Sequence, residues 1–411
     1  MKIIDVRTIL LTGPSTNDPY MREADEERSA SFIEIHTDTG IVGLGETYAG
    51  YFFPEVVSVI VDFFKPILID QDVENIPELW ARMYHCGNFW CRVGLGSIVL
   101  TGIEAALWDL KGKMLGLPVH QLLGGCQHDR LPFYATGGPS NYPLDKLAAK
   151  IDYYLSLGFQ AFKLGAGAFH LETGFQLPTG AEEAAQLEAD KLDFVRRHVG
   201  SDVKIMLDGH MNEHPLEKTW NLDVAKTVMT ACEPYDLFFF EEPLDYSDPE
   251  AYAELCRNTS IPIAGGECLT SLIEWRPYLR AGAFDIGQPD ASFNAGLSET
   301  KRVADELKSQ DRRIATHSWG AGGSLMQNVH LAFSCSNTAI VEVTADYGPL
   351  HSELIGDSLS IKDGCFLPPQ TPGLGVVLTE QTKSQFPFIP GSGAYSSVPG
   401  KISPEELGIR K

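Results

Sequence analysis

The sequence lacks the cysteine pairs and the long apolar stretches that mark several classes of protein. Its eight cysteines are scattered, and no two of them stand at the C-x₂-C spacing of a zinc site. We interpret most of them as small buried hydrophobic residues. Met1 leads directly into strand-like residues, without the apolar segment that a signal peptide or a membrane span requires. We therefore expect a protein of the reducing cytoplasm that does not enter a membrane.

Positive charge is also scarce. Lys and Arg total 32 against 55 for Asp and Glu, which gives a formal net charge of −23. This charge repels polyanions over most of the surface, so nucleic acid is a poor candidate partner. A small anionic substrate remains possible where a metal ion or a local group of Lys and Arg reverses the sign of the field in one pocket.

Internal repeats, low-complexity tracts and a dinucleotide fingerprint are missing as well. Gly43-Leu44-Gly45 lacks the third glycine of that fingerprint, so a nicotinamide cofactor is unsupported. What is present is a chain of 411 residues, 44% of them hydrophobic. Such a chain can bury a large core and divide into more than one domain.

Residues 1–125 predict an α+β domain that begins with three strands. The expected strands are residues 2–12, 31–36 and 41–47. Asp38-Thr39-Gly40 predicts the turn of an antiparallel meander. Residues 13–28 contain Pro14 and Pro19 without sustained periodicity, and they predict a mobile lid loop. Residues 54–115 then show a helical pattern, with an apolar stripe along residues 97–115.

After residue 125, short apolar runs alternate with amphipathic stretches of helical length. The eight runs are residues 131–136, 161–164, 203–207, 237–240, 262–264, 284–287, 312–316 and 339–343. Eight alternating strands and helices predict an α/β fold, a (β/α)₈ barrel over residues 126–358, with its active site at the carboxyl ends of the strands. We expect residues 359–411 to return and pack on the N-terminal capping domain.

Three acidic residues each follow an apolar strand and are separated by about one strand-helix-strand unit. They are Asp208, Glu241 and Glu267. Equivalent strand ends converge on one mouth of a barrel, and carboxylate oxygens suit a hard cation. The alternative is that each residue caps the next helix, which we would favour for one such residue alone. Together they predict a Mg²⁺ site, and Mn²⁺ would fit nearly as well.

Asp290 and His317 stand at the next two strand ends, one unit apart. Asp290 can orient His317 and raise its basicity, so we predict that His317 is a general base. A lone histidine here would more simply be a core residue. The acidic cluster beside it favours catalysis.

Three further residues carry predicted roles. Lys163 can meet a substrate carboxylate or accept a proton, although a surface lysine is the alternative. His210, two residues after Asp208, can donate a proton to a leaving group, or it can be a surface histidine. Glu342 can bond the substrate while protonated, or it can form a structural salt bridge.

The chain resembles the enolase superfamily, in its mandelate racemase branch, over essentially its whole length. The motif that carries this resemblance is residues 102–113 followed by Pro118 and residues 121–125. Glu241-Glu242-Pro243 and Gly266-Glu267 are similar to that family's motifs around its second and third metal ligands. The resemblance implies that Asp208, Glu241 and Glu267 bind Mg²⁺ and that Asp290 and His317 form the base.

One position departs from that family's pattern, because Gly165 stands where the second lysine of a Lys-x-Lys pair often occurs. A base on only one face of the substrate argues against a racemase. Asp208-Gly209-His210 resembles members that dehydrate acid sugars. We therefore predict dehydration of an aldonate or aldarate, with a racemase, epimerase or cycloisomerase and a non-catalytic sugar-acid-binding protein as the alternatives.

The partner expected from this function is a small-molecule carboxylate, and we also expect a homo-oligomer, from dimer to octamer. The side chains that would read the substrate's hydroxyl groups are harder to place from sequence. Our candidates are Tyr20, Arg22, His85, Arg92, Asn212 and Trp319, together with Tyr51, Phe52 and Trp90.

Overall fold

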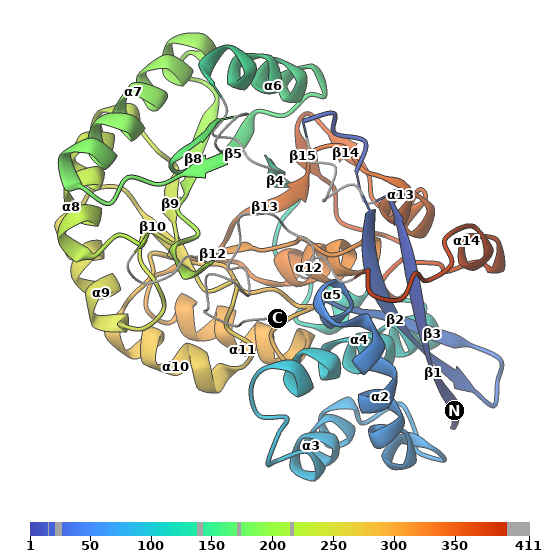
Figure 1. The fold of residues 1–411 in the computed structure, drawn as a ribbon. Coiled ribbons are helices and arrows are strands. Elements are labelled where there is room, and N and C mark those ends of the chain that lie inside the picture. The colour runs from blue at the N-terminus through green and yellow to red at the C-terminus, as the bar shows by residue number, and fades with distance from the viewer. Residues whose placement is uncertain (15, 21–26, 138–142, 171–173, 214–217, 393–411) are drawn as a thin grey trace.

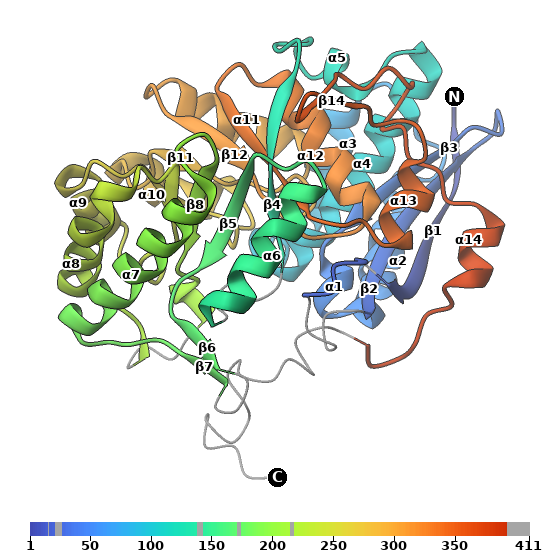
Figure 2. The same ribbon diagram turned by 90° about the horizontal axis from the view of Figure 1, so that it is seen from above.

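The computed structural model describes residues 1–392 except residues 15, 21–26, 138–142, 171–173 and 214–217. An N-terminal capping domain packs beside a barrel (Figures 1 and 2). The helices of the capping domain are α1 (Ala49–Phe52), α2 (Pro54–Leu68), α3 (Ile76–Cys86), α4 (Leu95–Leu115) and α5 (Val119–Leu122). In the described part of the chain, no helix is long and apolar enough to cross a membrane.

The predicted meander is present as β1 (Ile3–Pro14), β2 (Glu27–Thr37) and β3 (Val42–Thr47), in that order. The first two strands are longer than predicted, because Gly13 pairs with Arg28 and Pro14 with Glu27. Both ends of the expected lid loop therefore belong to the sheet. The two strands extend each other because each offers backbone hydrogen-bond partners to the other. The periodicity of either segment alone cannot reveal this pairing. The centre of that loop, residues 21–26, lies outside the described residues.

Helix α4 differs from the single apolar stripe expected for it. Every one of its residues from Gly96 to Leu110 is buried. The helix is enclosed because β3 covers one side, where Leu44 N–H bonds Asp109, and the barrel covers the other, where Trp108 bonds Ser298. A helix with two covered faces needs apolar residues all round.

The barrel closes as predicted, because the last strand pairs in parallel with the first. Its strands are β4 (Leu131–Thr136), β5 (Ala161–Gly165), β8 (Lys204–Asp208), β9 (Phe239–Glu241), β10 (Ile263–Gly265), β11 (Ile286–Gly287), β12 (Arg313–Thr316) and β13 (Thr338–Thr344). Each strand contributes one residue to a buried interior cluster, Tyr134, Ala161, Met206, Phe239, Ala264, Ile286, Ala315 and Ile340. This cluster fills the barrel, so chemistry is confined to its ends.

Helices surround these strands in an outer ring (Figure 1). They are α6 (Leu144–Ser156), α7 (Ala181–Val199), α8 (Leu222–Cys232), α9 (Pro249–Asn258), α10 (Leu272–Ala281), α11 (Leu297–Lys308), α12 (Gly322–Ser334) and α13 (Pro349–Ile355). A short hairpin of β6 (Ala168–His170) and β7 (Gly174–Gln176) follows β5.

The C-terminal segment contacts both domains. Strands β14 (Ile361–Lys362) and β15 (Cys365–Phe366) pair with each other, and β15 pairs with the start of β4 in the barrel. Farther along, α14 (Glu380–Gln385) carries Lys383, whose ammonium lies 2.7 Å from Glu34 of β2. Residues 393–411 lie outside the described residues. The three domain boundaries drawn from the sequence therefore stay a prediction.

A buried histidine pair joins the capping domain to the barrel. His120 of α5 and His330 of α12 stack with ring centroids 5.4 Å apart. His330 Nδ1 accepts the backbone N–H of His120 at 3.1 Å, and His330 Nε2 lies 3.2 Å from the carbonyl oxygen of Leu374. The neutral ring satisfies both contacts. A second proton on His330 would point one N–H at another.

We expect this pair to make the fold sensitive to acid. Burial lowers the pKa of His120 to about 4 and that of His330 to about 3, from an ordinary 6.5. The unfolded chain therefore binds these protons first as the pH falls. The contribution to stability is complete above about pH 6.5 and is lost towards pH 4, by about 1.4 kcal/mol per pH unit for each histidine.

Chemical denaturation between pH 7 and pH 5 measures this effect. His330→Gln should give a shallower loss of unfolding free energy with falling pH than the wild type. His85→Gln, which changes an exposed histidine, is the matched control. Equal slopes for the wild type and His330→Gln would contradict the assignment.

Candidate active site

Acidic side chains gather at the carboxyl ends of neighbouring barrel strands. Asp208 ends β8 and Glu241 ends β9, and the two residues are directly paired in the parallel register. Glu267 follows β10 by two residues, after Gly266, whose φ of +112° and contact with the Trp275 ring exclude a side chain. Asp208 and Glu241 are buried, and the Glu267 side chain is 13% exposed. The strand ends therefore bring these residues to one mouth.

Lys163 lies among these carboxylates. Its Nζ is 2.9 Å from Asp208, 2.8 Å from Glu241 and 3.1 Å from Glu342. Burial lowers the pKa of Lys163, but the three carboxylates outweigh it and hold the pKa well above its ordinary value. Lys163 is a fixed positive charge at the mouth, and the surface-lysine alternative is wrong.

The three predicted metal ligands do not form the tightest group of donor atoms. Among the described residues, the group whose ligand atoms all lie within 4.8 Å of one another is Glu242, Glu267 and Cys268. Asp208 and Glu241 instead converge on the ammonium of Lys163, because its charge offsets their repulsion. The sequence thus predicted the convergence of three strand ends but missed how the side chains divide there.

One oxygen of Glu241 supports a cation at this mouth. Glu241 Oε2 is buried and has no hydrogen-bond partner in the part of the chain that the structure describes, while Oε1 accepts from Lys163. A buried carboxylate oxygen without a partner is costly, so an additional ligand is expected there. The donors at hand are carboxylate oxygens, which Mg²⁺ and Mn²⁺ prefer. The residues present therefore fit a hard divalent cation.

Asp290 and His317 form a hydrogen-bonded dyad. His317 Nδ1 lies 2.8 Å from Asp290 Oδ2. The other oxygen, Oδ1, accepts three hydrogen bonds of 2.7 Å, from the backbone and hydroxyl of Ser292 and from the amide of Asn328. Asp290 is therefore a charged acceptor in a fixed position. It makes Nδ1 the donor and leaves His317 Nε2 to face the mouth.

The imidazole of His317 faces further acidic groups. Its Nε2 lies 3.6 Å from Glu267 and 3.9 Å from Glu342. Burial lowers the pKa of His317, but Glu267, Glu342 and Asp290 together raise it to about 10. The sequence analysis preferred a catalytic role for His317 because acidic residues were expected beside it. The structure places two of these acidic residues against Nε2, the ring nitrogen that does not bond Asp290.

His210 reaches the same carboxylates from β8. Its Nε2 lies 3.1 Å from Asp208 and 3.8 Å from Glu267. The backbone here is not extended, since His210 has a φ of +47° and its N–H bonds Asp208. The left-handed turn still directs the ring to the mouth, where 41% of the side chain is exposed. This exposure leaves it accessible to a ligand.

The surroundings of Glu342 favour its role in a salt bridge over the role of a protonated group that donates a hydrogen bond to the substrate. It is buried, accepts the backbone N–H of Ser318 at 2.9 Å and lies beside Lys163 and His317. Burial raises the pKa of Glu342, but Lys163 and His317 outweigh it, and the net shift is downward. A carboxylate held in this way is charged and accepts hydrogen bonds.

The substrate-binding candidates divide between the mouth and the surface. Asn212 bonds Cys268, next to Glu267, and Trp319 bonds the hydroxyl of Tyr51. In the described part of the chain, exposed His85 and Arg92 have no hydrogen bond or ion pair with the acidic cluster. The Tyr20 ring contacts that of Tyr153 at 5.9 Å. Arg22 lies outside the described residues.

Sequence reasoning missed two capping-domain residues that contact His317 or Trp319. The ring of Tyr48, which precedes α1, meets the His317 imidazole edge-on at 5.8 Å between centroids. Arg28 of β2 lies over the Trp319 ring at 3.9 Å. Neither residue belongs to a motif. The one available signal was a basic residue at the start of an apolar strand in an acidic chain.

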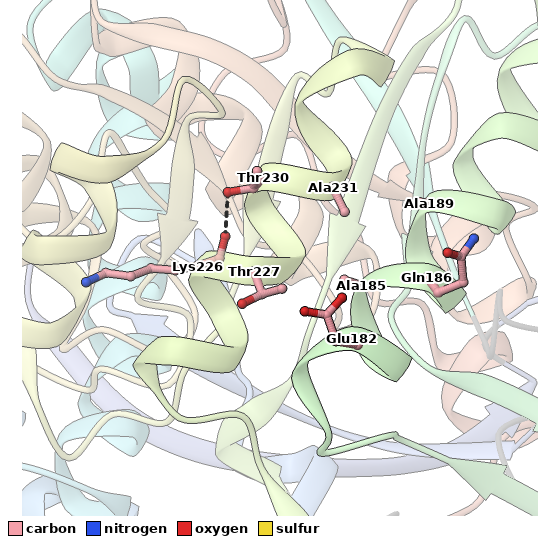
Figure 3. A pocket seen from close by; sticks show the side chains of 8 residues that line it. All are labelled: Glu182, Ala185, Gln186, Ala189, Lys226, Thr227, Thr230 and Ala231. Atoms are coloured by element: carbon pink, nitrogen blue, oxygen red, sulfur yellow. Dashed lines mark hydrogen bonds between the residues drawn. The ribbon is translucent and has the colours of Figure 1, made fainter.

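A surface groove between α7 and α8 is a separate feature (Figure 3). It has a volume of about 500 Å³ and is lined by Glu182, Ala185, Gln186, Ala189, Lys226, Thr227, Thr230 and Ala231. Both helices belong to the outer ring (Figure 1). The acidic cluster lies instead at the strand ends. Its open, mixed lining shows no convergence of titratable groups, so we place the chemistry at the barrel mouth.

A closed (β/α)₈ barrel with carboxylates and imidazoles at the carboxyl ends of its strands has the architecture of a barrel enzyme. Residues 146–382 match the family model described as Enolase C-terminal domain-like. Residues 13–124 match the N-terminal domain of mandelate racemase / muconate lactonizing enzyme. The chain therefore belongs to the enolase superfamily, as its junction motif predicted.

Three relatives show the range of this family. An arabinonate dehydratase of Saccharolobus solfataricus is 29% identical, over 92% of this chain and 97% of that protein. A D-galactonate dehydratase of Cronobacter sakazakii is 32% identical over 85% and 89%. The crystal structure of a racemase from Streptomyces coelicolor with bound magnesium has a TM-score of 0.79 at 26% identity, and the match covers 93% of this chain and 99% of that one.

Proposed function

We propose that this protein dehydrates an acid sugar, an aldonate or aldarate, to a 2-keto-3-deoxy acid with the help of Mg²⁺. The observation that carries the proposal is the position of two imidazoles on either side of one carboxylate. His210 Nε2 lies 3.8 Å from one oxygen of Glu267, and His317 Nε2 lies 3.6 Å from the other. Elimination of water needs one base and one acid in the same site. The names of the two dehydratase relatives support the same reaction.

The roles of the two histidines follow from their surroundings. A proton next to a carboxylate is weakly acidic, and its loss leaves an enediolate dianion that must be stabilised. In its neutral form, which the cation would favour by offsetting the charge of Glu267, His317 takes this proton from C2 at Nε2, because Nδ1 is held by Asp290. His210 donates a proton to the C3 hydroxyl, which leaves as water. The enol that remains takes up a proton at C3 and becomes the 2-keto acid.

Asp208, Glu241 and Glu267 are the residues that would hold the cation, with the unpartnered Glu241 Oε2 as the strongest indication. When bound, Mg²⁺ supplies a Lewis acid that offsets the charge of these carboxylates and of the enediolate. Lys163 adds a positive charge from β5 that is fixed by three ion pairs. It can bind the substrate carboxylate or the enediolate electrostatically.

A racemase, epimerase or cycloisomerase is the second candidate, because it would pass through the same enediolate. A solved relative is described as a racemase. Gly165, which pairs with Asp208 at the end of β5, supplies no second base there. Turnover of a stereochemically complete set of aldonates and aldarates, followed by NMR in D₂O, tests the choice. A product that has lost water supports dehydration. A product that keeps all the hydroxyl groups of its substrate supports a racemase, epimerase or cycloisomerase.

His210→Asn should separate proton removal from water loss. The variant keeps His317, so exchange of the C2 proton with D₂O should continue, while dehydration falls by roughly 10²- to 10³-fold because the leaving hydroxyl lacks its acid. NMR measures both rates in one sample. His198→Asn, on the outer helix α7, is the control. Equal loss of exchange and dehydration would assign His210 to another role.

A further inference from the structure

Arg28 is a buried cation that has no anionic partner among the described residues. It lies on β2, in the capping domain, and is only 2% exposed. One nitrogen, Nη1, donates to the backbone carbonyl of Trp319 at 2.9 Å. Nε and Nη2 are buried and have no hydrogen-bond partner. A guanidinium is always charged, and burying it without a counterion is unfavourable.

The described residues around Arg28 do not supply that counterion. Glu46 lines the same small cavity, which has a volume of about 10 Å³. Both Glu46 oxygens are already bonded, to the backbone N–H groups of Ala321 and Ser324. Two other buried cations of the barrel do have carboxylate partners, Lys163 with three of them and Lys191 with Glu188.

Arg28 faces the catalytic mouth through aromatic side chains. Its guanidinium lies 3.9 Å from the Trp319 ring and 5.3 Å from the Tyr51 ring. Tyr51 stacks on Tyr48 at 5.1 Å, and Tyr48 contacts His317 at 5.8 Å. Arg28 and His317 thus stand at opposite ends of one aromatic wall. A molecule lying along this wall would have its reacting end at His317 and its far end at Arg28.

We propose that Arg28 binds a second carboxylate at the far end of the substrate, so that the preferred substrate is an aldarate and not an aldonate. This inference rests on the proposed acid-sugar function and names the substrate class within it. Two free N–H groups of a guanidinium match the two oxygens of a carboxylate. A hydroxyl group would leave the charge of Arg28 unpaired.

Binding of such a group requires a local change. A cavity of about 10 Å³ holds no more than about one water molecule. The Trp319 ring covers one face of the guanidinium and is only half-buried. Its single side-chain hydrogen bond, to Tyr51, is 3.3 Å long. We therefore expect the Trp319 side chain to move when a diacid binds, and its fluorescence to change.

Calorimetry with matched acid pairs tests the proposal on the full-length protein with Mg²⁺. The probes are galactarate against galactonate and glucarate against gluconate. The wild type should bind one diacid at least about tenfold more tightly than its monoacid. Arg28→Gln should weaken that diacid by about 100-fold and leave the monoacid within about threefold. The Trp319 fluorescence change should accompany the diacid alone.

Controls separate this inference from the proposed reaction. Arg28→Lys keeps the positive charge but loses the planar guanidinium that can bond both oxygens of a carboxylate. It should therefore show part of the preference for diacids that Arg28→Gln loses. Arg82→Gln, on the exposed side of α3, should behave as the wild type. Equal binding of diacids and monoacids by the wild type, or equal losses in Arg28→Gln, would overturn the inference. If the wild type prefers diacids but forms no keto acid from them, the result would count against the proposed dehydration and not against the role of Arg28.

Discussion

His317→Asn is expected to abolish exchange of the C2 proton of an acid sugar with D₂O and to lower kcat by roughly 10²- to 10⁴-fold. His317 Nε2 is the nitrogen that faces the mouth, because Asp290 engages Nδ1 at 2.8 Å. Asparagine keeps a polar group of similar reach but cannot take the proton. NMR in D₂O measures the exchange, and a coupled assay for the keto acid measures kcat.

The controls must show that only the base is lost. Mg²⁺ affinity and melting temperature should stay close to those of the wild type, since His317 is not among the proposed ligands. His198→Asn provides a surface histidine for comparison. Asp290→Asn should also be slow, because it removes the charge that orients the ring. Exchange at the wild-type rate in His317→Asn would show that another group removes the proton.

Removal of the metal should have an effect at least as large. Chelation of divalent ions is expected to lower turnover by about 10³-fold or more, and added Mg²⁺ or Mn²⁺ should restore it. The physical reason is that an enediolate dianion would otherwise form beside four carboxylates, those of Asp208, Glu241, Glu267 and Glu342. Among the described residues, Lys163 is the one lysine or arginine that forms an ion pair with this group.

Glu241→Gln sharpens this experiment. It removes the charge of the carboxylate whose Oε2 has no partner, so Mg²⁺ should neither restore activity nor raise the melting temperature of this variant. Glu182→Gln, in the outer groove, removes an acidic residue from elsewhere on the barrel and should respond as the wild type. Full activity of chelated protein, with metal content verified by elemental analysis, would exclude the proposed cation.

The sequence by itself determined the barrel. Each of the eight strands is short, apolar and followed by an amphipathic stretch, so its place could be predicted from local periodicity. It also placed Asp208, Glu241, Asp290 and His317 together, because residues at equivalent strand ends of a barrel share one mouth. The family motif at residues 102–125 led to the same fold independently.

Only the tertiary structure decided which side chains pair within that mouth. Lys163 lies between Asp208 and Glu241, while Glu267 lies nearer Glu242 and Cys268, because charges rearrange over a few ångströms that spacing along the chain does not encode. Burial of Arg28 depends on Trp319, a residue 291 positions away in the chain. Pairing and burial depend on contacts between distant segments, whereas strand ends are set by neighbouring residues, so the sequence located this site and the fold alone arranged it.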